Sequence, residues 1–279
     1  MKTPFKTVGG KIYIAPNGYM PKTLSYSGIR AYQTCPRDYY YKYVLGVQYD
    51  NYSPAFTFGR IMHSMLETHM KTSGDYDEVK SALETGIEKE GLEASLVAQA
   101  LAKNKELTQD QLEKEILSWK KMLWGMYQNN RPHLAQWTPK ATEQYFEIPL
   151  RNPDRPDEIL PFRMRGFIDL VADGLIVVDH KTAQGFGDDK DWETSMQPYI
   201  YAMGCKQLYG EYPQEIAFNC LLKRKRDYNT KVVHIDFDYN RLSYVYREIV
   251  NTVQLMLLGE WQKGGANHYY FCDTCKSGI

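Results

Sequence analysis

The sequence lacks a surplus of charge of either sign, and it lacks long apolar runs. Its 34 Lys and Arg residues balance 34 Asp and Glu residues, so the chain has no global positive field. A nucleic-acid site would therefore have to be a local basic patch beside an acidic centre. No run approaches the roughly 20 apolar residues that a membrane span needs, and residues 1–20 lack the apolar core of a signal peptide. We therefore expect a cytoplasmic protein with no membrane partner.

Cysteine is scarce and odd in number. Five cysteines without a secretory signal indicate a reducing compartment rather than a disulfide framework. Internal repeats and low-complexity tracts are also absent. Tyrosine, by contrast, is abundant, with 23 copies against 10 Phe, and it suits surfaces that are partly apolar and partly wet, including platforms on which bases stack.

The segment 163–182 carries the strongest chemical pattern. Two apolar runs flank a turn at 172–174, which predicts a β-hairpin. The first run ends near Asp169 and the second near Asp179, with Lys181 two residues later on the same strand face. Such a set can hold a divalent cation and a water beside a phosphodiester. The alternative is that Asp169 caps a strand and Asp179 forms a structural salt bridge with Lys181.

The metal-site alternative depends on the length of the hairpin loop. A two-residue loop at 173–174 pairs Asp169 with Val178 and places the two acids on opposite faces. A three-residue loop, with Gly174 left-handed, pairs Asp169 with Val177 and places both acids on one face. A metal site therefore requires the three-residue loop.

A length of 279 residues suits one large domain or two small ones, and we expect a single α/β domain. We expect residues 1–21 to form an arm or a short hairpin, and Pro36 to interrupt a first helix that is capped by Ser25 or Ser27. Pro198 is tolerable only near the start of its helix or at a kink. The remaining expected elements are a helix at 58–70, a helical insertion at 75–135 with a break at 103–108, a strand at 142–150, the hairpin, a helix at 191–209, strands at 215–222 and 231–237, a helix at 240–259 and a tail at 262–279.

Several polar residues are candidates for function, each with a plainer alternative. His63 follows Gly59 by one helical turn and precedes Glu67 by another, so it can be a ligand oriented by Glu67 or a surface histidine. Glu143 and Glu147 share a strand face and can either join the acidic centre or lie exposed.

Two further sets of polar residues are candidates for function. Gln197 and Tyr201 are four residues apart and share a helix face. The consecutive bases Lys223, Arg224, Lys225 and Arg226 suit phosphate contact at a hairpin tip, or form an ordinary solvated turn.

Taken in order, these segments resemble the PD-(D/E)XK nucleases and, more narrowly, their RecB-like branch, which includes RecB and AddB nuclease domains and Cas-four-type nucleases. The resemblance implies a restriction-endonuclease-like core, a mixed central sheet flanked by helices, with a helical insertion. The matching segments are LSYSGIRAYQTCPRDYYYKYVLG at 24–46, FGRIMHSMLE at 58–67, GFIDLV at 166–171, VVDHKT at 177–182 and QPYIYA at 197–202.

The resemblance also assigns roles to residues. It implies that Lys181 positions or deprotonates the attacking water, and that Gln197 and Tyr201 shape the site and hold the phosphate. Carboxylate oxygens suit Mg²⁺ or Mn²⁺, and an imidazole favours Mn²⁺. The implied metal ligands are His63, Asp169, Asp179 and the backbone carbonyl of His180.

The cysteines depart from the family pattern. Several RecB-like enzymes bind an iron–sulfur cluster through one N-terminal and three C-terminal cysteines, and here Cys35, Cys272 and Cys275 match only three of the four. The options are an iron–sulfur cluster with a non-cysteine ligand, a zinc site completed by His268, a vestigial site, or thiols without metal. A bound metal would hold the tail against the first helix.

The resemblance implies a metal-dependent DNA nuclease, with an exonuclease on single-stranded DNA or duplex ends ahead of an endonuclease. Its setting would be recombination, repair or phage DNA processing, in a bacterial or phage-infected cell. A recombination protein or a second copy of the chain is a conceivable partner. The alternative is a catalytically silent nuclease-fold protein that binds nucleic acid or a protein.

Overall fold

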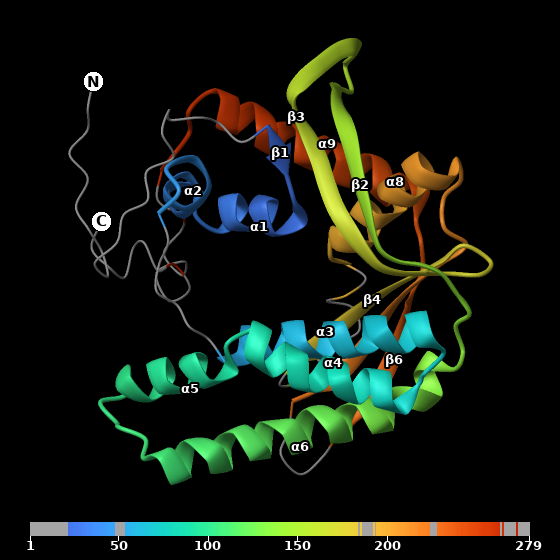
Figure 1. Cartoon of the computed structure of the whole chain (residues 1–279). Helices are drawn as coiled ribbons and strands as arrows, with labels where there is room; N and C mark the ends of the chain where they lie inside the picture. Colours follow the sequence, from blue (N-terminus) through green and yellow to red (C-terminus); the bar gives the residue numbers. More distant parts are fainter. Residues whose placement is uncertain are drawn as a thin grey trace. The chain divides into compact units, whose positions relative to one another are not determined.

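The computed structural model describes residues 22–47, 54–183, 194–223 and 228–262, together with the single positions 185, 192, 264 and 272. The chain divides into two compact units, which are described separately: residues 1–51, 146–166 and 238–279, and residues 52–145 and 167–237. Figure 1 shows the elements with their labels. Within the described residues, no helix is long and apolar enough to cross a membrane.

The second unit contains a mixed β-sheet. The end of β3 (Arg155–Ala172) pairs antiparallel with β4 (Ile176–Ala183), which runs parallel to β5 (Glu215–Leu222), and β5 pairs antiparallel with β6 (Thr230–Ile235). All but the first residue of β5 are buried, as expected for a strand covered on both faces. The predicted fold class, a mixed sheet flanked by helices, is confirmed.

The turn between β3 and β4 settles the loop length. Ala172 pairs with Ile176, so the loop has three residues, and both Gly174 (φ 74°) and Leu175 (φ 58°) are left-handed. The three-residue loop and the left-handed Gly174 are confirmed, but the pairing of Asp169 with Val177 is wrong. Because the loop is 173–175 rather than 172–174, the observed register continues to place Asp169 opposite Asp179. Both acids therefore share one face.

Four helices of the second unit come from the predicted helical segments at 58–70 and 75–135. They are α3 (Pro54–Thr72), α4 (Tyr76–Lys89), α5 (Leu92–Leu101) and α6 (Gln109–Leu134). Their apolar sides form one core with alternate residues of the sheet, such as Val178 and Ala217. The predicted break at 103–108 ends in a capping box, in which the Thr108 side chain accepts from the Gln111 N–H.

The helix predicted at 191–209 is interrupted. Trp192 and Thr194 are helical, whereas Ser195 and Met196 are not, and α8 (Gln197–Tyr209) starts at Gln197. Pro198 falls in the first turn, where its missing N–H removes no helical hydrogen bond. Apolar periodicity alone did not reveal this boundary.

The first unit contains β1 (Thr23–Leu24), α1 (Tyr26–Thr34), α2 (Pro36–Tyr39), a π-helical turn (Tyr40–Val44) and α9 (Tyr239–Leu257). Ser25 caps α1 by accepting from the Gly28 N–H, and Pro36 begins a new helix, as predicted. Helices α1 and α9 contact each other, with Gln33 donating to Glu248.

Strands β2 (Pro139–Asn152) and β3 pair with each other and pass through both units. Both are longer than predicted. Within the first unit, Gly166 is required by close packing, because a Cβ there would lie 2.6 Å from the Phe146 ring.

Candidate functional site

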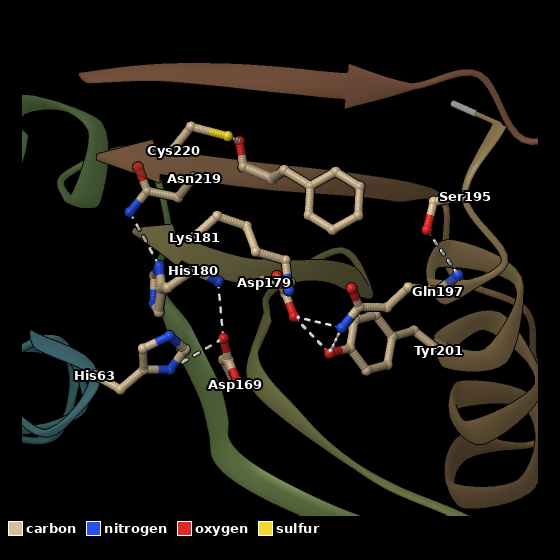
Figure 2. A network of polar contacts seen from close by, with 11 residues as sticks. His63, Asp169, Asp179, His180, Lys181, Ser195, Gln197, Tyr201, Asn219 and Cys220 are labelled. Atoms are coloured by element: carbon tan, nitrogen blue, oxygen red, sulfur yellow. Dashed lines mark hydrogen bonds and ion pairs between the residues drawn. The ribbon is translucent and has the colours of Figure 1, made fainter. Parts of the chain in front are cut away.

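The site of the second unit begins where β3 and β4 part. The Asp169 carboxylate accepts a hydrogen bond of 2.7 Å from the main-chain N–H of His180, and it lies 3.5 Å from Nδ1 of His63 on α3 (Figure 2). Burial, and then the charge of Asp179, raise the pKa of Asp169 well above its usual value. Burial also lowers the pKa of His63, against the opposing charge of Asp179. Asp169 and His63 thus lie close together, and burial favours the neutral form of each side chain.

Asp179 is enclosed by the sheet and α8. One carboxylate oxygen accepts from Gln197 Nε2 at 3.2 Å and from the Tyr201 hydroxyl, while the other lies 2.5 Å from Lys181 Nζ (Figure 2). Gln197 also donates to the Tyr201 oxygen at 2.7 Å. Strand alternation explains this geometry, because Asp179 and Lys181 point to the face that α8 covers. The acids and the predicted Gln197–Tyr201 pair therefore meet in one network.

Glu143 enters the same region from β2. Its backbone is left-handed (φ 48°) inside a strand, an irregularity that re-aims a side chain. Burial, followed by the charges of Asp169 and Glu67, raises the pKa of Glu143 to about 7. Glu147 instead forms an ion pair with Arg163. Of the two strand acids considered, Glu143 alone is at the acidic centre.

Three of these side chains form a donor set suitable for a cation. One ligand atom each of His63, Glu143 and Asp169 lies within 4.8 Å of the others, the one group of three or more such residues among those that the structure describes. Two carboxylates and an imidazole are donors that Mg²⁺ and Mn²⁺ accept. His63 and Asp169 were predicted as ligands, whereas Asp179 lies beside this set and Glu143 takes part in it. Glu67, expected to orient His63, instead pairs with Lys71.

A buried polar network supports the site from the other face of the sheet. Nδ1 of His180 is 2.9 Å from Nδ2 of Asn219 on β5 (Figure 2). Asn219 and Asn130 of α6 exchange two side-chain hydrogen bonds of 2.7 and 2.8 Å. Burial, then the positive charges of His63 and Lys181, lower the pKa of His180 to about 3. The ring is therefore neutral, and the network fixes the main chain between Asp179 and Lys181.

A groove of about 560 Å³ opens onto the donor set. It is lined by the half-buried side chains of His63, Glu143, Asp169 and Lys223 and by the exposed side chains of Phe56, Arg60 and Lys89. Gly59 also lines it, and a Cβ there would lie 3.3 Å from the Thr182 hydroxyl. The acidic centre is thus reached from a side that carries cations.

The sequence matches a known family. A family profile of the PD-(D/E)XK nuclease superfamily matches residues 23–277. The chain belongs to the PD-(D/E)XK nuclease superfamily. A crystal structure from Eubacterium rectale, provisionally named an exonuclease, is similar with a TM-score of 0.62 and 13% identity, covering 97% of this chain and 94% of that one. At this identity the likeness shows the shared fold.

Two other comparisons add no argument about this nuclease-family chain. The match to the structure of SSO0001 covers 85% of this chain and 77% of that one at 11% identity. Its TM-score of 0.37 is too low to indicate a shared fold. No curated protein matches.

The remaining predicted residues are only partly described. Cys35 and Cys272 are buried and contact each other within the first unit, while Cys275 and His268 lie outside the described residues, so the metal prediction there stays a prediction. Of the basic loop, Lys223 is described and Arg224, Lys225 and Arg226 are not. Residues 1–21 and most of the tail at 262–279 are likewise outside the described part.

Sequence reasoning missed the Asn130–Asn219 pair. One signal was available, because Asn219 is a lone polar residue in the apolar strand EIAFNCLL. Buried amides need partners, so an asparagine there required one. Its partner, 89 residues away, had no local signal.

Proposed function

We propose that this protein is a divalent-metal-dependent deoxyribonuclease of the RecB-like branch that hydrolyses phosphodiester bonds. The observation that supports it most is the meeting of His63, Glu143 and Asp169 beside the Asp179–Lys181 pair. The donor set fits Mg²⁺ or Mn²⁺, and the adjoining Asp179 and the His180 carbonyl complete the proposed ligands. A bound ion would supply a water of lowered pKa and neutralise charge on the phosphate.

The protein's own residues would perform the remaining tasks. Lys181, fixed by Asp179, would orient the attacking water and stabilise negative charge on the phosphate. Gln197 and Tyr201 hold Asp179 in place and would bound the phosphate site. The groove would admit a polynucleotide from the side of its cations. We propose an exonuclease on single-stranded DNA or duplex ends that acts in recombination, repair or phage DNA processing.

The test is cleavage of labelled single-stranded and duplex DNA with Mg²⁺ or Mn²⁺, comparing wild type with Lys181→Ala. We expect wild type to cut, and Lys181→Ala to lose about 10²–10⁴-fold in rate, the usual contribution of a group that handles the proton of a nucleophile. The matched control is Lys121→Ala, an exposed lysine on α6. Equal rates for Lys181→Ala and wild type, or an inert wild type, would refute the proposal.

The cysteine site is a separate part of this proposal. Cys35 and Cys272 are buried together, which is the first requirement for shared ligation of an iron–sulfur cluster or zinc. Anaerobic purification followed by metal analysis and a visible absorbance spectrum tests it. We expect iron with a brown colour, or zinc without colour, that is lost in Cys35→Ser. Metal-free protein would contradict it.

A further inference from the structure

Phe56 is an exposed aromatic ring at the mouth of the groove. It is 71% exposed, whereas Phe58, two residues later on α3, is fully buried. A single exposed aromatic residue is ordinary on a protein surface and by itself indicates nothing. Phe56 differs because it lines the groove that holds the donor set.

The face of α3 that lines the groove carries four kinds of side chain in order along its length. Phe56, Arg60, His63 and Glu67 lie at helical spacing on one side of α3, and all four line the groove. At 1.5 Å per residue, Phe56 is about 10 Å along the helix from His63. The order along the groove is thus an aromatic ring, a cation, the proposed ligand and an acid.

Cations gather at the Phe56 end. Lys223 lies close to this end of α3, with its Nζ 3.4 Å from the Ala55 carbonyl and 5.8 Å from the centre of the Phe58 ring. Arg60 and Lys89 line the same groove, and Arg60 is held by Glu90. The N-terminal end of α3 also carries the positive pole of the helix dipole. The opposite end is acidic, with Glu67 and Glu143.

We propose that Phe56 is a stacking platform for an unpaired base flanking the scissile phosphate, and that the groove therefore prefers single-stranded polynucleotide and holds it from one side. This inference rests on the proposed function and names its substrate class. Bases of a single strand have free faces that stack on aromatic rings regardless of sequence, whereas bases within a duplex are already stacked. The cations would hold the adjoining phosphates, and the acidic end would not retain the strand beyond the cut.

The experiment separates stacking from charge by measuring binding in a chelator, where no cleavage occurs. Fluorescence anisotropy compares a labelled oligothymidylate with an abasic strand of the same length, which keeps the phosphates and lacks the bases. We expect wild type to prefer the oligothymidylate by about tenfold, the usual weight of one stacked base. Phe56→Ala and Phe56→Leu should lose this preference, and Phe56→Trp should keep it.

Two controls complete the design. Tyr76→Ala removes an exposed aromatic ring at the far end of α4, about 20 Å along that helix from Lys89, and should change nothing. Lys223→Gln should weaken the binding of the oligothymidylate and of the abasic strand to the same extent. It should also reduce the salt dependence of binding by about one phosphate contact.

The outcomes distinguish this inference from the proposed function. If wild type prefers the oligothymidylate through Phe56 but never cuts, the nuclease proposal fails and the platform stands. If wild type cuts while Phe56→Leu keeps the full preference, the platform is refuted. A change of oligomeric state in Phe56→Ala, seen by sedimentation, would overturn it in favour of contact with a second copy of the chain.

Discussion

The two walls of the site differ in the burial of their polar side chains and in the hydrogen bonds and ion pairs that fix them. On one wall, formed by β4 and α8, Asp179 is 2% exposed and is bonded to Gln197, Tyr201 and Lys181. On the other, formed by α3 and β2, His63 and Glu143 are only half-buried, and Glu143 has a left-handed backbone. The first wall is organised before any ligand arrives, and the second faces the groove. The proposed catalytic pair Asp179–Lys181 and the groove-lining residues His63 and Glu143 thus lie on separate elements.

The largest effect should come from the closed wall. Asp179→Asn keeps the side-chain volume but removes the charge that pairs with Lys181, so we expect cleavage to fall by about 10²–10⁴-fold. The control is Glu67→Gln, in the same groove, where the carboxylate pairs with a lysine on its own helix. Initial rates on single-stranded DNA measure both. Similar losses in the two variants would show that the walls are equivalent.

Removing the support behind the closed wall should mainly affect stability. Asn130→Leu leaves the buried Asn219 amide without its partner on α6, which should lower the free energy of unfolding by about 1–3 kcal/mol. Urea denaturation measures this, with Asn129→Leu, at the exposed neighbouring position, as control. If Asn130→Leu unfolds at the same urea concentration as Asn129→Leu, the network does not stabilise the sheet.

The open wall should respond through metal affinity. Glu143→Gln removes one carboxylate of the donor set, so we expect Mn²⁺ to bind at least about tenfold more weakly in calorimetry. Unchanged affinity would exclude Glu143 as a ligand.

The same substitution, although it should weaken Mn²⁺ binding, should make the metal-free protein more stable at pH 8. Because the pKa of Glu143 is raised to about 7 in the folded state, its contribution to stability is complete below the ordinary pKa near 4.5 and is lost as the pH rises to about 7. Glu143→Gln should therefore raise the melting temperature of metal-free protein at pH 8, but not at pH 4. A melting temperature that is lowered at pH 8 would contradict this.

The smallest effect should come from Tyr201→Phe. Asp179 loses one hydrogen bond but keeps those of Gln197 and Lys181, so the free energy of unfolding should fall by about 1 kcal/mol. Tyr209→Phe, on the same helix and away from this network, is the matched control. If the free energy of unfolding fell as much as in Asn130→Leu, the hydroxyl of Tyr201 would have a structural role beyond its hydrogen bond to Asp179.

Much of the closed wall could be predicted from the sequence. The period of two placed Asp179 and Lys181 on one face, and the helical period placed Gln197 with Tyr201, because both pairs are local. The predicted hairpin register correctly placed Asp169 and Asp179 on one face, but it was shifted by two residues along β4. The shift was missed because nothing in the sequence indicates that Leu175 is left-handed. The Asn130–Asn219 pair and the position of Glu143 depend on long-range packing, which local patterns do not contain.

Where β3 and β4 separate, the Asp169 carboxylate takes the place of a main-chain carbonyl as hydrogen-bond acceptor. The register would offer the Ile168 carbonyl to the His180 N–H, yet that N–H donates to the Asp169 carboxylate. One side chain therefore ends a β-ladder and supplies a proposed ligand. Loss of this aspartate would remove the proposed ligand and leave the His180 amide without its acceptor in the same step. The proposed ligand role and the local backbone geometry therefore depend on the same carboxylate.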